Sequence, residues 1–151
     1  MKWIFICGLI FSMQTTFSQP VSVEYDAKLA DSLGADDYGM KNYIMAILKT
    51  GPSKETDKEK LNAYFKGHMD NITLMADQGK LVVAGPFGKN TDGLRGMFIL
   101  NVSTVEEAIK LVEKDPAVAN GVFVVEFHPW YGSAALPMYL ETHKRISKIT
   151  P

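Results

Sequence analysis

The sequence predicts an α+β domain of ferredoxin-like type, with a four-stranded antiparallel sheet and two helices on one of its faces. Two observations lead to this prediction. Between residues 39 and 131, apolar stretches typical of strands alternate with amphipathic stretches typical of helices, in the order strand, helix, strand, strand, helix, strand. The chain also has 151 residues, of which 46% are hydrophobic, and this suffices for one domain with a substantial core.

The first 18 residues have the pattern of a secretory signal peptide. Lys2 precedes an apolar run over 3–13, and Thr16 and Ser18 provide small residues at the −3 and −1 positions of a cleavage site. The run is shorter than the ~18–20 residues of a membrane span, which disfavours the alternative of an uncleaved anchor. We therefore expect an exported protein, periplasmic or extracellular, with no membrane contact after cleavage.

Composition argues against several kinds of chemistry in the mature chain. Cleavage removes Cys7, the only cysteine, and with it any thiol nucleophile, disulfide or thiolate ligand. A net charge of −1 without a basic block disfavours nucleic acid as a partner. The three histidines lie far apart, and the sequence has no Gly-rich phosphate loop, so we expect neither a metal nor another cofactor.

Residues 19–38 predict an acidic linker with one short helix. Tyr25, Leu29 and Leu33 recur at a spacing of four, and Gly34 supplies a helix end. We expect these apolar residues to dock the helix on the domain, which begins at residue 39.

The first strand is predicted at 39–49 and ends in a turn at Gly51 and Pro52. Its apolar side chains alternate between the two faces. They are Tyr43, Met45 and Ile47 on one face and Ile44, Ala46 and Leu48 on the other. A strand with two apolar faces requires cover on both sides of the sheet.

The first helix of the domain is predicted to begin near Thr56, with Glu59 completing a capping box, and to end at Gly79. Its apolar stripe consists of Leu61, Tyr64, Phe65, Met69, Ile72, Met75 and Ala76. His68 falls inside this stripe. A buried imidazole needs a partner or a function, because burial without a hydrogen bond costs roughly 1–3 kcal/mol.

The second and third strands are predicted at 81–84 and 94–102, separated by a polar loop at 89–93. Gly85-Pro86 ends the second strand, since proline cannot donate to a strand ladder. The third strand is apolar on both faces except at Arg95 and Asn101.

The second helix begins after Ser103 and Thr104, which stand three residues before Glu106 and Glu107 as a doubled capping signal. Its predicted buried stripe is Val105, Ala108, Ile109 and Val112. Asp115-Pro116 interrupts the helix. The fourth strand is predicted at 121–128, with Pro129 as its end.

The segment 132–151 is predicted to be a helical tail, with Leu140, His143 and Ile146 on one side of a helix over 137–149. Two helices leave the second face of the sheet open, although its strands are apolar there too. We expect a second subunit to cover this face, in a homodimer whose partner is wrapped by the tail.

Three segments of the chain resemble the YCII-related (YciI-like) family of dimeric α+β barrels: KGHM in the first helix, GKLVVAGPF at the second strand, and KDPAVANGVFVVEFHPW before and within the last strand. The resemblance covers about residues 38–131. It implies a ferredoxin-like subunit, dimers that meet sheet to sheet, and a pocket between helix and sheet. It also implies a catalytic pair formed by His68 and Asp115. The chain departs from the family pattern at Ala117 and at Tyr64-Phe65, where an aromatic and a basic residue are common.

The candidate residues each allow two interpretations. Asp115 either orients the His68 imidazole for proton transfer or simply caps a short turn, with His68 a satisfied core residue. Arg95 either binds a substrate carboxylate or pairs with Glu126 on a neighbouring strand. His128 either lines the same pocket or meets solvent.

Gly85, Pro86 and Phe87 either form the rim of the pocket or only end a strand. The function expected from all these residues is binding of a small-molecule ligand, with cofactor-free proton transfer of the isomerase or lyase type at His68. The alternatives are a non-catalytic ligand-binding module and a structural dimerisation module.

Overall fold

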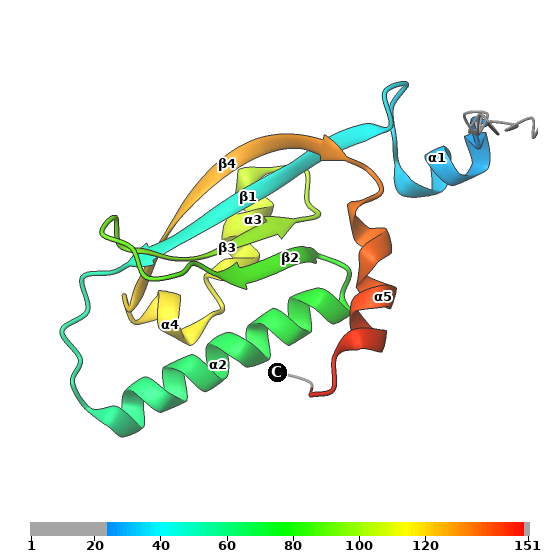
Figure 1. The fold of residues 1–151 in the computed structure, drawn as a ribbon. Helices are drawn as coiled ribbons and strands as arrows, with labels where there is room; N and C mark the ends of the chain where they lie inside the picture. Colours follow the sequence, from blue (N-terminus) through cyan, green and yellow to red (C-terminus); the bar gives the residue numbers. More distant parts are fainter. Residues whose placement is uncertain (1–23, 150–151) are drawn as a thin grey trace, which may run out of the picture.

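The computed structural model describes residues 24–149 and contains the predicted order of strands and helices (Figure 1). The strands are β1 (Met40–Thr50), β2 (Leu81–Pro86), β3 (Leu94–Leu100) and β4 (Phe123–Ser133). The helices are α1 (Ala27–Leu33), α2 (Lys58–Asp77), α3 (Val105–Val112), α4 (Pro116–Ala119), the 3₁₀ helix η1 (Leu136–Met138) and α5 (Tyr139–Ile146). The antiparallel sheet has the strand order β2-β3-β1-β4, which confirms the ferredoxin-like prediction. The predicted signal peptide, 1–18, lies outside the described residues.

The main core lies between the sheet and the helices α2, α3 and α4. Its buried members are Ile44, Ala46, Leu48, Leu81, Phe98, Leu100, Val102 and Phe123 from the strands and their ends, with Met75, Ala108, Val112 and Ala117 from the helices. Removal of this apolar surface from water, at roughly 25 cal/mol per Å², is the main force that holds the helices on the sheet.

Helix α2 buries a face slightly different from the predicted stripe. Asn71 and Met75 are buried and His68 is half-buried, whereas Phe65 is 37% exposed and Ala76 is exposed. The predicted start was also displaced: Asp57, not Thr56, is the N-cap, and its carboxylate accepts the backbone N–H groups of residues 59 and 60. In α3, by contrast, the predicted capping residues are in contact: Thr104 accepts the N–H of residue 107, and the Glu107 carboxylate accepts the N–H of Ser103.

Strand β4 does not end at Pro129, as the sequence analysis expected, but continues to Ser133. It is an edge strand that pairs only with β1, and Pro129 stands opposite Ile44 in that ladder. An edge strand tolerates proline because one side of its backbone needs no donor. The extension carries Trp130 and Tyr131 into the sheet.

Helix α1 forms where predicted but does not dock through its apolar residues. It has no buried residue, and Tyr25 is 74% exposed. The αL turn at Gly34 (φ 68°) leads the chain away from the helix axis, so that α1 projects from the sheet in Figure 1. Polar contacts hold the segment instead: Lys41 Nζ donates to the carbonyl of Leu33 at 3.2 Å, and the Tyr131 hydroxyl donates to the Asp36 carboxylate.

The sheet face away from α2 and α3 carries a second apolar cluster. Tyr43, Val82 and Ile99 are buried there, packed with Val83, Met97, Trp130 and Leu136. The C-terminal tail lies at one end of this face in the same subunit, where the Tyr139 hydroxyl donates to the carbonyl of Val82. The second face is therefore covered in part by its own chain.

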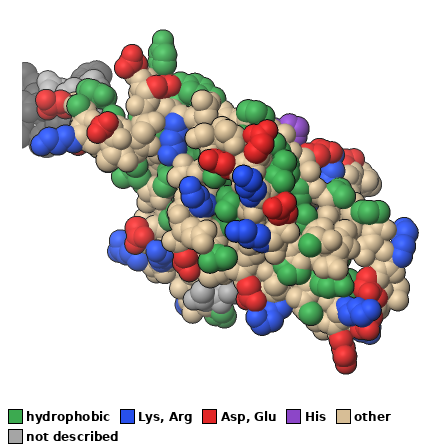
Figure 2. Space-filling view, turned by 180° about the vertical axis from the view of Figure 1, so that it is seen from behind, with side chains coloured by type: hydrophobic (Ala, Val, Ile, Leu, Met, Phe, Trp, Pro, Cys, Tyr) green, Lys and Arg blue, Asp and Glu red, His purple; other side chains and the backbone are tan. Residues whose placement is uncertain are grey.

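The exterior is of mixed character. Figure 2 shows acidic and basic side chains interspersed on the face seen from behind, with hydrophobic side chains distributed among them. Within residues 24–149, no helix combines the length and the apolar character that crossing a membrane would require.

Candidate active site

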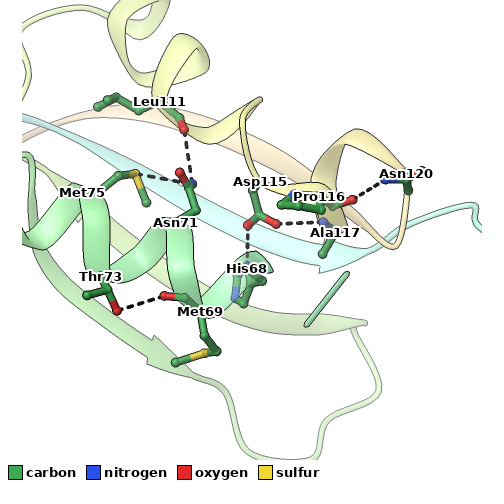
Figure 3. A network of polar contacts seen from close by, with 10 residues as sticks. All are labelled: His68, Met69, Asn71, Thr73, Met75, Leu111, Asp115, Pro116, Ala117 and Asn120. Carbon is green, nitrogen blue, oxygen red and sulfur yellow. Dashed lines mark hydrogen bonds and ion pairs between the residues drawn. The ribbon is translucent and has the colours of Figure 1, made fainter. Parts of the chain in front are cut away.

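Helices α2 and α4 meet at a glycine. A Cβ atom on Gly67 would lie 2.5 Å from Cγ of Pro116, which is too close for real atoms, so this approach depends on the missing side chain. His68 follows Gly67 and Asp115 precedes Pro116. The same contact therefore brings the imidazole and the carboxylate together, as Figure 3 shows.

The Asp115 carboxylate makes both of the contacts that the sequence left as alternatives. One oxygen, Oδ1, accepts the backbone N–H of Ala117 at 2.8 Å and so caps α4, whose first residue is Pro116. The other oxygen, Oδ2, contacts Nδ1 of His68. Asp115 is fully buried, at 0% exposure, and both of its oxygens thus have partners.

The imidazole of His68 is fixed on three sides. Nδ1 faces the Asp115 carboxylate, the ring stacks on Phe98 with centroids 6.1 Å apart, and it meets Phe123 edge-on at 5.2 Å. An ionised carboxylate can only accept, so a neutral imidazole in this contact carries its proton on Nδ1 and leaves the lone pair on Nε2. The side chain is 14% exposed. Nε2 makes no hydrogen bond with the described residues, and it is not a fully buried atom. The ring therefore offers a base at the edge of the core.

Asn71, one turn after His68, is a polar core residue that the sequence analysis missed. Its Nδ2 donates to the carbonyl of Leu111 at 3.3 Å and lies 3.9 Å from Sδ of Met75, which ties α2 to α3 (Figure 3). Asn71 follows His68 by three residues and so lies on the same helix face, and this spacing could have predicted from the sequence that Asn71 is buried near His68.

A break in the β1–β3 register turns Arg95 toward the helices. Leu48 pairs with Gly96 and Lys49 pairs with Leu94, so Arg95 is the additional residue of a bulge. Its guanidinium carbon lies 5.8 Å from the centroid of Phe123, on the helix-covered face. Regular alternation would have given Arg95 the side opposite to Gly96.

A cavity of about 150 Å³ opens beside this arginine. Its lining includes Arg95, Phe65, Phe123, Ser53 and Glu55. The rings of Phe65 and Phe123 are 5.9 Å apart, and the latter ring also meets His68. The ring of Phe123, a residue that the sequence predicted only as part of a strand, thus contacts both His68 and Arg95.

Glu55 is the acidic group of this cavity, and its charge already has partners. The backbone N–H of Asp57 is the largest cause that lowers the pKa of the Glu55 carboxyl; burial opposes it, and the N–H of Thr56 and the Lys60 ammonium add to it. Arg95 forms no ion pair with any carboxylate of the described residues.

The remaining predicted site residues lie elsewhere. His128 belongs to β4 and pairs with Met45 of β1. It lies on the side of the sheet opposite to His68. Glu126 bonds Lys49 at 2.7 Å, so the alternative that it pairs with Arg95 is wrong; β4 is not even a neighbour of β3.

The segment of Gly85, Pro86 and Phe87 runs beside the bulge without lining the cavity. Gly85 and Pro86 pair with Met97 and Gly96, and the N–H of Phe87 donates to the carbonyl of Arg95 at 2.9 Å. These contacts fix the backbone that carries the guanidinium.

A second, polar cavity of about 310 Å³ lies at the other end of the sheet, lined by Lys41, Asn42, Asn101 and Ser103 among others. Burial lowers the pKa of the Lys41 ammonium. Over the described part of the chain, no three His, Cys, Asp or Glu residues are grouped so that they could hold a metal ion.

Comparisons with known proteins identify a family and include similarity to a solved structure. No match is found among the curated proteins. A solved structure of 5-chloro-2-hydroxyhydroquinone dehydrochlorinase (TftG) from Burkholderia phenoliruptrix AC1100, in complex with 2,5-dihydroxybenzoquinone, is similar with a TM-score of 0.41 and 20% identity, over 58% of this chain and 92% of that one. The model of the YCII-related domain matches residues 43–131, and the chain therefore belongs to the YCII-related family.

Proposed function

We propose that this protein binds a small organic molecule beside His68 and transfers a proton without a cofactor. The observation that carries the proposal is the orientation of the imidazole: Nδ1 is held by a fully buried carboxylate, while Nε2 has no partner among the described residues. A base needs such a free lone pair and a group that stabilises the imidazolium once the proton arrives.

The proposed step conserves atoms and charge. Nε2 takes a proton from a carbon next to a carbonyl group, and the electron pair of the C–H bond moves into an enolate. The imidazolium, paired with Asp115, then returns the proton to another atom of the ligand, which gives an isomerisation. In an elimination, the enolate electron pair instead forms a new C=C bond, a leaving group on the neighbouring carbon departs with the electron pair of its own bond, and the imidazolium gives its proton to the departing group or to water.

Hydrogen–deuterium exchange tests this proposal without knowledge of the substrate. Small carbon acids are incubated with the protein in D₂O, and deuteration at carbon is followed by proton NMR. We expect exchange of at least one compound to exceed the buffer rate and to fall at least 100-fold in His68→Gln, consistent with the 10²–10⁴-fold typical of general bases. His143→Gln, an exposed histidine of α5, is the control.

Exchange that His68→Gln leaves unaltered would contradict the role of His68. Binding of the compounds without exchange would favour the alternative, a ligand-binding module that uses the same pocket without turnover.

We also propose that a second copy of the chain covers the remainder of the open sheet face, and that the protein acts after export. The half-buried Met97 and the 42% exposed Val124 belong to this face and support the first point. Light scattering with size-exclusion chromatography should give a dimer for wild type and a monomer for Met97→Glu.

Fractionation of the native host tests export. Recovery of the protein in the cytoplasmic fraction would contradict it.

A further inference from the structure

The cavity beside Arg95 combines three features of an anion site. The Arg95 guanidinium belongs to no ion pair of the described residues. The carboxylate of the adjacent Glu55 is already bonded by Lys60 and by backbone N–H groups, and two phenylalanine rings form an apolar wall. A guanidinium forms bidentate bonds with a carboxylate, and a planar apolar body packs well on aromatic rings.

The size of the cavity limits the ligand. A volume of about 150 Å³ is known to suffice for one benzene ring. The site thus fits a single small ring or a short unsaturated chain rather than a nucleotide or a peptide.

His68 does not line this cavity, but its imidazole contacts the same Phe123 ring as the Arg95 guanidinium. The imidazole centroid lies 5.2 Å and the guanidinium carbon 5.8 Å from the centroid of Phe123, so the two are at most 11.0 Å apart. A ligand of one ring with one carboxylate spans much of this distance. Its acid group at Arg95 would leave the opposite end directed toward the imidazole.

We propose that Arg95 anchors the carboxylate of a small planar organic acid, whose body lies against Phe65 and Phe123 and whose far end reaches His68. This inference rests on the proposed function for the role of the far end. The inference adds the class of ligand, an unsaturated or aromatic monocarboxylate, and identifies Arg95 as the residue that selects it. The bulge at Arg95 is then a specificity device, since it moves one cation from the open face to the pocket.

Benzoate and its neutral isostere benzamide test the inference directly. Binding to the full protein at pH 7 is measured by ¹⁵N-detected titration of backbone and Arg side-chain signals. We expect benzoate to bind at least tenfold more tightly than benzamide to wild type. Arg95→Met, which keeps the apolar stem, should lose this preference, and Arg95→Lys should retain only part of it because an ammonium cannot form the planar fork.

Lys49→Met is the matched control. It removes a cation from the neighbouring strand on the opposite face, where Lys49 bonds Glu126. We expect it to bind benzoate as wild type does. Circular dichroism and thermal unfolding establish that each variant is folded.

The outcomes separate this inference from the proposed function. If benzoate and benzamide bind equally, or if Arg95→Met binds benzoate like wild type, the anion site is refuted whatever the exchange assay gives. If benzoate binding depends on Arg95 but no compound exchanges hydrogen, the anion site stands and proton transfer fails.

Discussion

The two faces of the sheet are both apolar, yet they bury different chemistry. The helix-covered face encloses a polar pair, His68 and Asp115, together with the amide of Asn71. The opposite face buries Tyr43, Val82 and Ile99, and the side chains of its ion pair, Lys49 with Glu126, are 34% and 50% exposed.

The buried carboxylate and the buried amide of the helix-covered face have backbone partners that the helices supply. Asp115 binds the N–H of Ala117 at the start of α4, and Asn71 binds the carbonyl of Leu111 in α3. On the open face, the buried Tyr43 carries a neutral hydroxyl, which donates to the carbonyl of Ser133 in β4 at 2.9 Å. The buried ionisable groups, His68 and Asp115, therefore lie on the helix-covered face, while the open face provides a mainly apolar surface.

The largest difference between the faces should appear when one carboxylate is removed from each. Asp115→Ala deletes a helix cap and leaves the His68 N–H without its partner, so we expect the free energy of unfolding to fall by about 3 kcal/mol. Glu126→Ala should cost less than about 1 kcal/mol, because the pair with Lys49 is solvated. Urea unfolding measures both, and equal losses would contradict the comparison.

A smaller effect is expected where the helices approach each other. Alanine normally stabilises a helix relative to glycine by roughly 1 kcal/mol, but Gly67→Ala places a methyl group against Pro116. We expect a net loss of about 1–3 kcal/mol and altered ring signals of His68.

Gly85→Ala is the matched control for this variant, since nothing lies within 4 Å of the added atom. Its free energy of unfolding should stay within about 0.5 kcal/mol of wild type. A stabilised Gly67→Ala variant would show that the α2–α4 contact is loose.

The amide that joins α2 to α3 should contribute less than the carboxylate. Asn71→Ala removes the donor to Leu111 and should lower the free energy of unfolding by about 1–2 kcal/mol. Chemical denaturation monitored by circular dichroism provides the value. Little change in that value would mean that the carbonyl of Leu111 finds water when the amide is absent.

The smallest effect concerns the polar tie of the N-terminal segment. The Tyr131 hydroxyl is the largest cause that lowers the pKa of the Asp36 carboxyl. A depressed folded pKa stabilises the protein above the unfolded value of about 3.9, and this stabilisation is lost as pH falls through the lower folded value. Tyr131→Phe should thus be slightly less stable than wild type at pH 6, and the difference should vanish at strongly acidic pH. Thermal unfolding over this range tests it; a difference that grows on acidification has the wrong sign.

Sequence periodicity was sufficient for the order of elements and for the placement of His68, because both depend on local patterns of apolar residues. It was insufficient wherever pairing partners decide the geometry. The bulge that turns Arg95 depends on the register of β1 against β3, and the passage of β4 through Pro129 depends on its edge position.

The same limit applies to the docking of the site. The fit of Gly67 against Pro116 joins segments far apart in the chain, and nothing in either segment alone signals it. The position of His128 on the other face followed the strand alternation, yet the sequence could not show that His68 lies on the opposite side of the sheet.

The central claim is that Asp115 holds the proton of His68 on Nδ1 and leaves Nε2 as the free acceptor. Long-range ¹H–¹⁵N correlation spectra of the protein, recorded at a pH where the imidazoles are neutral, report which nitrogen carries the proton. The account predicts an Nδ1–H tautomer for His68, with exposed His143 as an internal reference for an unrestrained ring. An Nε2–H tautomer at His68, or a mixture like that of His143, would contradict it.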